Sequence, residues 1–181
     1  EELEARVTAL GPALPRGEVL WHMIGHIQSR KADRVVAHAD LVHSVDSTRL
    51  AARLDRLAGA AGRVLPVLLE LNVSGEASKY GFPASEPPDW RALPGALAPL
   101  AGLDHLQIRG LMTMAPQGAS PQQAREVFRA LRVLAERLRR EQPWSDWAEL
   151  SMGMSDDLEA AIAEGATIVR VGRAIFGPLD G

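Results

Sequence analysis

The sequence has no cysteine among its 181 residues. Disulfide bonds, Cys-x-x-Cys redox chemistry and thiolate metal sites are therefore excluded. Long hydrophobic runs are also lacking, since the longest, around Val64–Val73, is far too short to cross a bilayer. The first residues, from Glu1 to Arg6, contain neither the basic nor the apolar segment of a secretory signal peptide. We therefore expect a cytoplasmic protein that does not bind membranes.

An excess of charge of one sign is missing as well. The chain carries 20 basic and 23 acidic residues, which gives a net charge of −3. Without a basic stripe, nucleic-acid binding loses its main electrostatic driving force, and we expect no nucleic-acid partner. The composition, 46% hydrophobic and 24% charged, is that of an ordinary globular protein. No Ser/Gly linker or charge block divides the chain, so a single domain over residues 1–181 is predicted.

Short β-rich runs alternate with helical patterns along the chain. The six candidate strands are Glu18–Ile24, Leu41–Val45, Val64–Val73, His105–Met112, Trp147–Met152 and Thr167–Val171. Apolar periodicity predicts helices over residues 1–10, Ser47–Ala61 and Ser120–Arg140. The last of these begins with a Ser-Pro-x-Gln capping pattern. No long helix is expected over residues 85–101, because Pro94 and Pro99 interrupt the pattern.

This alternation predicts an α/β fold with a parallel sheet and right-handed crossovers. A doubly wound dinucleotide-binding sheet should show G-x-G-x-x-G after its first strand, and that motif does not occur. A complete (β/α)8 TIM-type barrel has eight strands and typically ~250 residues. We therefore expect a barrel in which about six of the eight β/α units are present and the first two strands are lacking.

The ends of the last two strands are candidates for an anion site. Phosphate in such barrels often binds at the loops after strands seven and eight. Gly172 allows a ligand close to the backbone, the turn from Arg173 offers N–H groups, and Ser155 offers a hydroxyl. The alternative is that Ser155 only caps a helix and Gly172 only forms a turn. Asp156 and Asp157 would repel a phosphate, which favours Gly172–Arg173.

Arg170 lies in the last candidate strand. In the alternation of a strand, Ile168, Arg170 and Gly172 share one face. A guanidinium among barrel-lining residues is costly without an anionic or acceptor partner. Either a structural carboxylate or a ligand supplies that partner, and the residues do not decide between the two.

We expect no metal site. His22 and His26 would lie ~13 Å apart on a strand at about 3.3 Å per residue, and the other three histidines, His38, His43 and His105, are isolated in the sequence. Asp156 and Asp157 are adjacent at a helix start and do not form an acid/base pair. Neither G-x-S-x-G nor a P-loop is present.

Five collinear segments together resemble the pyridoxal phosphate homeostasis protein family. They are Trp21–Lys31, Leu71–Phe82, Ile108–Met114, Leu150–Asp157 and Val169–Gly177. The family's barrel resembles the N-terminal barrel of alanine racemase. The resemblance implies pyridoxal 5′-phosphate (PLP) as cofactor and a role in vitamin B6 homeostasis, with PLP-dependent apo-enzymes as recipients. It also implies a cytoplasmic protein, monomeric when complete, without strong catalytic turnover.

The resemblance also implies roles for individual residues. Ser155 and the backbone at Gly172 and Arg173 would hold the phosphate. Arg170 would face the pyridine nitrogen, which makes the ring a weaker electron sink. Met112 and Met154 would pack near the ring.

One family feature has no counterpart in this sequence. The family's Schiff-base lysine lies in a V-S-K-like segment on the first barrel strand, and the second strand ends in G-E-N. Neither motif occurs here, and Lys31 and Lys79 match other positions. We therefore expect an N-terminally incomplete version with no catalytic residue.

Two enzyme alternatives remain. An alanine-racemase-like amino-acid enzyme would need acid/base groups on both faces of its substrate, yet Tyr80, the single tyrosine, lies outside the expected site. A generic phosphate-binding barrel enzyme, such as a sugar-phosphate lyase, would need an acid/base pair that the sequence does not show.

Overall fold

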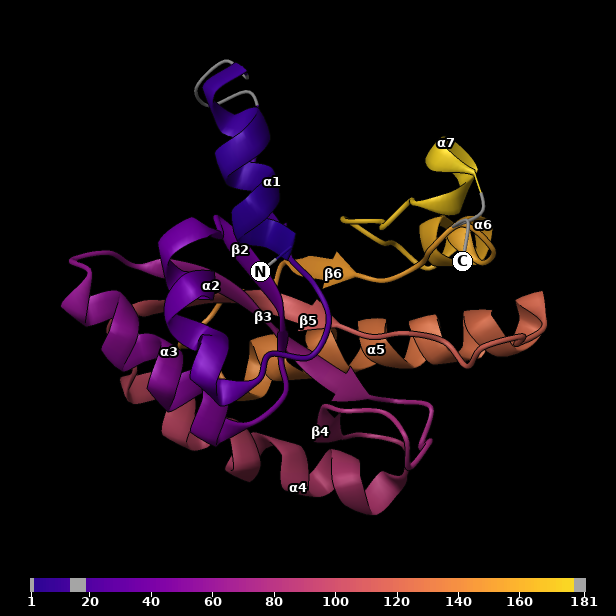
Figure 1. The fold of residues 1–181 in the computed structure, drawn as a ribbon. Helices are drawn as coiled ribbons and strands as arrows, with labels where there is room; N and C mark the ends of the chain where they lie inside the picture. Colours follow the sequence, from indigo (N-terminus) through magenta and orange to yellow (C-terminus); the bar gives the residue numbers. More distant parts are fainter. Residues whose placement is uncertain (1, 14–18, 178–181) are drawn as a thin grey trace.

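The computed structural model describes residues 2–13 and 19–177, which form a curled parallel sheet with helices on its outer side (Figure 1). The strands follow the order β1-β2-β3-β5-β6, and every pair is parallel. Their bounds are His22–Met23 (β1), Leu41–Val45 (β2), Leu65–Asn72 (β3), Leu106–Met112 (β5) and Glu149–Ser151 (β6). A further short strand, β4 (Phe82–Pro83), pairs with β3 outside this order. The predicted α/β fold of the barrel type is confirmed.

The central strands agree with the sequence prediction, whereas the two edges are shorter. The expected strand Glu18–Ile24 is reduced to the two residues of β1, and its first residue lies outside the described part. The expected strand Thr167–Val171 is reduced to a single bridge between Ile168 and Ser151. Within the described ranges each of these segments has a neighbouring strand on one side only, so half of its hydrogen-bonding groups cannot join a ladder. At β6 the strand begins later than expected, because Trp147 has φ 51° and cannot continue an extended chain.

Most of the helices lie against the convex side of the sheet (Figure 1). The α-helices are α1 (Glu2–Leu10), α2 (Ala32–His38), α3 (Thr48–Ala60), α4 (Pro87–Leu97), α5 (Pro121–Glu141), α6 (Leu158–Ala163) and α7 (Arg173–Phe176). Short 3-10 turns cover Gly11–Ala13, Ser29–Lys31 and Ala98–Gly102. The predicted cap of α5 is confirmed, since Ser120 and Gln123 exchange side chain–backbone hydrogen bonds of 3.3 and 2.9 Å.

The expectation for residues 85–101 was wrong, because α4 runs through Pro94. A proline inside a helix cannot donate to the carbonyl four residues earlier, here that of Trp90. The structure supplies another donor, since the Arg137 guanidinium on α5 reaches this carbonyl oxygen at 2.7 Å. Tertiary contact therefore compensates for the hydrogen bond that the proline removes.

The apolar core lies between the sheet and the outer helices. Val67, Leu69 and Leu71 of β3 pack in one cluster with Leu54 of α3 and Phe128 of α5, and each is at most 1% exposed. The opposite, concave face holds a much smaller buried cluster of Leu41, Leu68 and Met112, against which Met114 and Ile168 pack. The alternation of side chains along each strand thus separates a core from a second, sparsely apolar face.

Candidate functional site

Polar side chains from several strands gather on the concave face. Leu41, Leu68 and Met112 define this face, and strand register aligns His22 with Leu41, and Ser151 with both Met112 and Ile168. Alternation along β2 and β3 adds His43 and Glu70 to the same side. Four strands far apart in the sequence therefore contribute titratable or hydroxyl groups to one surface.

His22, His43, Ser151 and Arg170 form one hydrogen-bonded chain. The Arg170 guanidinium donates to Ser151 Oγ at 2.7 Å, and this oxygen lies 2.8 Å from His43 Nδ1. The other ring nitrogen of His43 lies 3.0 Å from His22 Nδ1. The expectation that His43 is isolated was therefore wrong, because parallel pairing of β1 with β2 places the two rings next to each other.

Arg170 is anchored by neutral groups. Besides Ser151, it donates to the backbone carbonyl of Thr113 at 3.1 Å. Among the described residues, no carboxylate lies within 4.0 Å of its guanidinium, so the structural ion pair considered above is not formed in this part of the chain. Burial lowers the pKa of Arg170, against the attraction of Asp157 and Glu70, but a guanidinium stays protonated at neutral pH. A cation thus faces the concave side without a carboxylate in direct contact.

The histidines on this face are held neutral. Burial, together with the charges of His22 and Arg170, lowers the pKa of His43 to about 3. Burial also lowers the pKa of His22, with Asp40 opposing and Arg109 supporting the shift.

Glu70 shows a pKa shift in the opposite direction. Its pKa is raised by burial and by nearby Asp46, against the attraction of Arg170 and His26. The Glu70 residue is 5% exposed. Burial therefore favours the uncharged form of both the histidines and this carboxyl group.

The loops after β6 and after Ile168 meet at the carboxyl-terminal rim of the sheet. The Ala174 N–H donates to Ser155 Oγ at 3.2 Å, and Arg173 forms an ion pair with Asp156. Ser155 is not the helix cap, since Asp157 precedes α6. The repulsion expected from Asp156 is offset by Arg173. The structure therefore brings Ser155 beside the Gly172–Ala174 turn, as the anion-site prediction requires.

Space and backbone donors are both available at Gly172. A Cβ added there would meet nothing within 4 Å, and its φ of −114° is open to any residue. Gly172 thus leaves room beside the backbone. Among the described residues, no acceptor is seen for the N–H groups of Gly172 and Arg173, whereas those of Ile175 and Phe176 donate to Gly172. The turn therefore presents two donors to a small anion.

The two methionines that were predicted to pack near the ring lie in different parts of this region. Met112 is 3% exposed and belongs to the concave cluster. Met154 is 40% exposed on the rim loop beside Ser155. Arg170 lies between the two, bonded to Ser151 below the rim.

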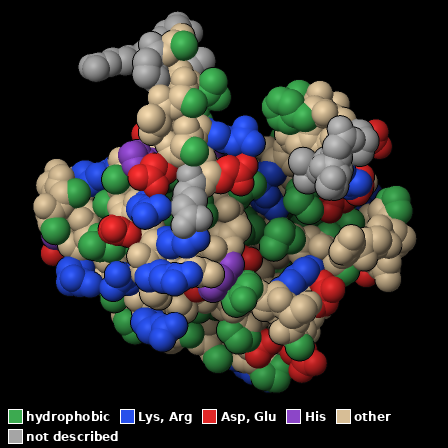
Figure 2. Space-filling model, viewed as in Figure 1, with side chains coloured by type: hydrophobic (Ala, Val, Ile, Leu, Met, Phe, Trp, Pro, Cys, Tyr) green, Lys and Arg blue, Asp and Glu red, His purple; other side chains and the backbone are tan. Residues whose placement is uncertain are grey.

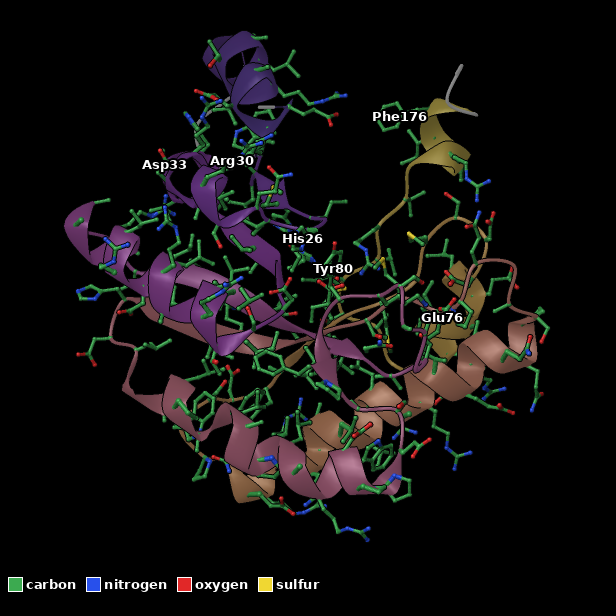
Figure 3. All side chains as sticks on the ribbon, turned by 60° about the horizontal axis from the view of Figure 1, so that its bottom comes forward. His26, Arg30, Asp33, Glu76, Tyr80 and Phe176 are labelled. Carbon is green, nitrogen blue, oxygen red and sulfur yellow. The ribbon has the colours of Figure 1, made fainter. Side chains whose placement is uncertain are left out.

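Sequence reasoning missed a second group on the rim. His26 Nδ1 lies 3.1 Å from Asp46 Oδ2, and its ring stacks on Tyr80 with centroids 3.9 Å apart. Figure 3 shows His26 and Tyr80 side by side, with Glu76 on the same loop as Tyr80 and Phe176 projecting from α7. Lys79 is tied into this loop by Ser74 and the Met114 carbonyl, both at 3.0 Å. The only sequence signal for these residues was that each of them follows a predicted strand.

A cavity of about 820 Å³ opens beside the polar chain. It is bounded by α1 and by the segment from Trp21 to Val35, and His22 and His26 line it. Figure 2 shows the surface dipping between α1 and the α6–α7 segment. His22, at the end of the polar chain, therefore borders an open cavity on the side of β1.

Two further kinds of site, a metal site and a membrane span, can be assessed for the described residues. No group of three or more His, Cys, Asp or Glu side chains there could hold a metal ion. None of the helices described is long and apolar enough to span a membrane.

Comparisons with known sequences identify the relatives of this chain. Residues 4–180 match the family model described as alanine racemase, N-terminal domain. A pyridoxal phosphate homeostasis protein of Vibrio alginolyticus is 37% identical over 180 residues, covering 99% of this chain and 74% of that protein. The protein of the same name from Pseudomonas aeruginosa is 44% identical over 160 residues, covering 88% of this chain and 65% of that protein. This chain thus spans about two thirds to three quarters of these relatives.

Solved structures extend the likeness to the fold. PipY of Synechococcus elongatus with PLP bound superposes with a TM-score of 0.85 at 40% identity, over 97% of this chain and 77% of PipY. The form without PLP gives a TM-score of 0.88, over 97% and 78% of the two chains. Alanine racemase of Clostridium difficile has a TM-score of 0.69 at 15% identity, over 96% of this chain and 44% of the racemase, which shows the shared fold alone.

Proposed function

Since this chain belongs to the alanine racemase N-terminal domain family and groups with the pyridoxal phosphate homeostasis proteins within it, we propose that it binds PLP and serves in the homeostasis of that cofactor. The observation that carries the proposal is that one edge of the sheet holds Ser155 beside the Gly172–Arg173 turn, together with half-buried Arg170 bonded to Ser151. PipY, a relative at 40% identity, has been solved with PLP bound.

The residues present fit the charge pattern of the cofactor. The rim offers two backbone N–H groups and the Ser155 hydroxyl for a phosphate dianion. Arg170 donates to a hydroxyl and a carbonyl and forms no ion pair with a described residue, so it can add an acceptor such as a pyridine nitrogen. Met112 offers an apolar surface beside it. PLP when bound supplies an electron-withdrawing ring, and a cation at its nitrogen keeps that ring a weaker electron sink.

We propose buffering and delivery of PLP in the cytoplasm rather than strong catalytic turnover. The supporting fact is that the curated relatives are named for homeostasis. PLP-dependent apo-enzymes are the recipients that this role requires. Racemase-like activity on the same barrel is the alternative, and an assay for racemisation of alanine by the loaded protein would reveal it.

The proposal is tested by titrating the chain with PLP and, separately, with inorganic phosphate. Arg170→Ala should loosen PLP by about 10- to 100-fold, the value of a hydrogen bond to a charged group, and leave phosphate nearly unchanged. Gly172→Val should weaken both ligands, because its side chain fills the space beside the donors. Equal affinity of the wild type and both variants for PLP would refute the assignment.

The form of the complex gives a second test. Lys31 and Lys79 are the only lysines in this sequence, and neither matches the family's cofactor lysine. We therefore expect this chain to bind PLP weakly and without a covalent bond. Borohydride reduction followed by peptide mapping should find no stoichiometric adduct, and such an adduct on Lys31 or Lys79 would contradict the expectation.

A further inference from the structure

The hydroxyl of Ser151 decides the direction of the hydrogen-bond chain from Arg170 to His22. A guanidinium only donates, so Ser151 Oγ accepts the 2.7 Å bond from Arg170. The hydroxyl has one proton of its own, and His43 Nδ1 at 2.8 Å is the acceptor that the described residues offer it. If His43 donated instead, the hydroxyl proton would be left buried without an acceptor, which is costly. Ser151 therefore donates to His43.

This direction fixes the protonation of both imidazoles. A neutral imidazole carries one proton, so His43 holds its proton on Nε2 and donates to His22 Nδ1 at 3.0 Å. His22 accepts this bond on Nδ1, so it must carry its own proton on Nε2. Every hydrogen bond in the chain points away from Arg170. Ser151 and His43 are each 1% exposed or less, so water cannot readily replace the hydrogen bond between them.

We propose that Ser151 and His43, backed by His22, are positioning residues that hold the Arg170 guanidinium toward the ligand. The proposal rests on the proposed function, because it assigns Arg170 to the pyridine ring. Ser151 fixes one side of the guanidinium, and the Thr113 carbonyl fixes another at 3.1 Å. His43 keeps Ser151 in its accepting orientation and adds no charge. The remaining N–H groups of Arg170 are thereby aimed without a carboxylate that would compete with the ligand.

A double-mutant cycle tests the positioning role. Ser151→Ala should weaken PLP binding about threefold to tenfold and leave inorganic phosphate binding unchanged. In the Arg170→Ala background the same change should have no further effect, because Ser151 acts through Arg170. Ser151→Thr keeps the hydroxyl and should restore most of the affinity. A matched control is Ser44→Ala, which removes another buried hydroxyl that donates to the Gly25 carbonyl at 2.6 Å, and should leave PLP binding unchanged.

A measurement without ligand separates this inference from the proposed function. Nitrogen-15 spectra of the histidine rings in the unliganded chain at neutral pH should show His43 as the neutral Nε2–H tautomer. In Ser151→Ala this preference should weaken. An Nδ1–H tautomer or a charged His43 would overturn the inference, as would a Ser151→Ala effect on PLP that persists without Arg170. Absence of PLP binding by the wild-type chain would refute the proposed function and leave the spectral test standing.

Discussion

The two faces of the sheet are built from the same strands but have different roles. On the convex face, β3 contributes Val67, Leu69 and Leu71 to a continuous apolar core under α3 and α5. On the concave face, the same strand contributes Leu68 and Glu70, beside a buried cluster of only three apolar residues. The residues of β3 on the convex face thus contribute to the stability of the fold, whereas those on the concave face include a titratable group.

The difference is also one of electrostatics. Charged residues on the helices of the convex side form exposed pairs, such as Arg137 with Glu141 at 2.7 Å, and such pairs contribute little to stability. On the concave face, Arg170, His43 and Glu70 lie in a buried setting that shifts the pKa of each toward its uncharged form. Polar groups are retained there at a cost in stability, which is typical of a binding site.

The largest effect is expected on the convex side. Phe128 of α5 is fully buried in the core, so Phe128→Ala should lower the free energy of unfolding by about 3–5 kcal/mol. Denaturant unfolding measures this. Val133→Ala, at a 37% exposed position of the same helix, is the control and should change stability by less than about 0.5 kcal/mol. Equal losses in the two variants would show that the helix does not pack as described.

An intermediate effect is expected at the rim, on affinity rather than stability. Ser155 Oγ accepts from the Ala174 N–H and keeps its own proton to donate to a phosphate. Ser155→Ala should therefore weaken PLP binding by about 1.5–3 kcal/mol, the value of a hydrogen bond to a charged group. The change is read from the dissociation constant by titration. Ser145→Ala provides a matched control, since this hydroxyl lies in the segment before β6 and donates to the carbonyl of Ile108 on β5, away from the rim. A similar loss in both variants would remove Ser155 from the site.

The smallest effect concerns pH and the concave face. The pKa of His43 is about 3 in the folded chain against an ordinary value of 6.5, so the unfolded chain binds a proton first as pH falls. His43 stabilises the fold fully above pH 6.5, and this contribution is lost as pH falls toward 3. Between pH 7 and 5 the free energy of unfolding should fall by about 1–2 kcal/mol from this group.

Urea unfolding at the two pH values tests this expectation. His43→Gln should flatten the dependence. Glu70 has a raised pKa and acts in the opposite direction, because the folded chain then binds its proton first as pH falls. A dependence unchanged in His43→Gln would show that His43 is charged in the folded state.

Local patterns predicted the central part of the fold well. The expected strands Leu41–Val45 and Val64–Val73 correspond to β2 and β3, and the capping pattern at Ser120 marks the start of α5. The errors lie where a segment depends on a distant partner. The edge strand after Thr167 is a single bridge, and α4 passes through Pro94 because Arg137 satisfies the freed carbonyl.

The candidate site, like the fold, was only partly predictable from the sequence. Sequence position predicted that Ser155 and the Gly172–Arg173 turn form an anion site, and the hydrogen bond from Ala174 to Ser155 shows that these segments are neighbours. His43 was interpreted as isolated, although it bonds to both His22 and Ser151. Its partners are 21 and 108 residues away in the chain. A local sequence pattern cannot predict such distant pairs.

The sequence by itself determined the alternation of strands and helices, the apolar face of each element and the family to which the chain belongs. These properties reside in residue order over a few turns or strands, where periodicity and capping act. The tertiary structure alone decided the polar chain from Arg170 through Ser151 and His43 to His22. Its physical basis is the register of parallel strands, which sets side chains from remote segments at the same level on one face of the sheet.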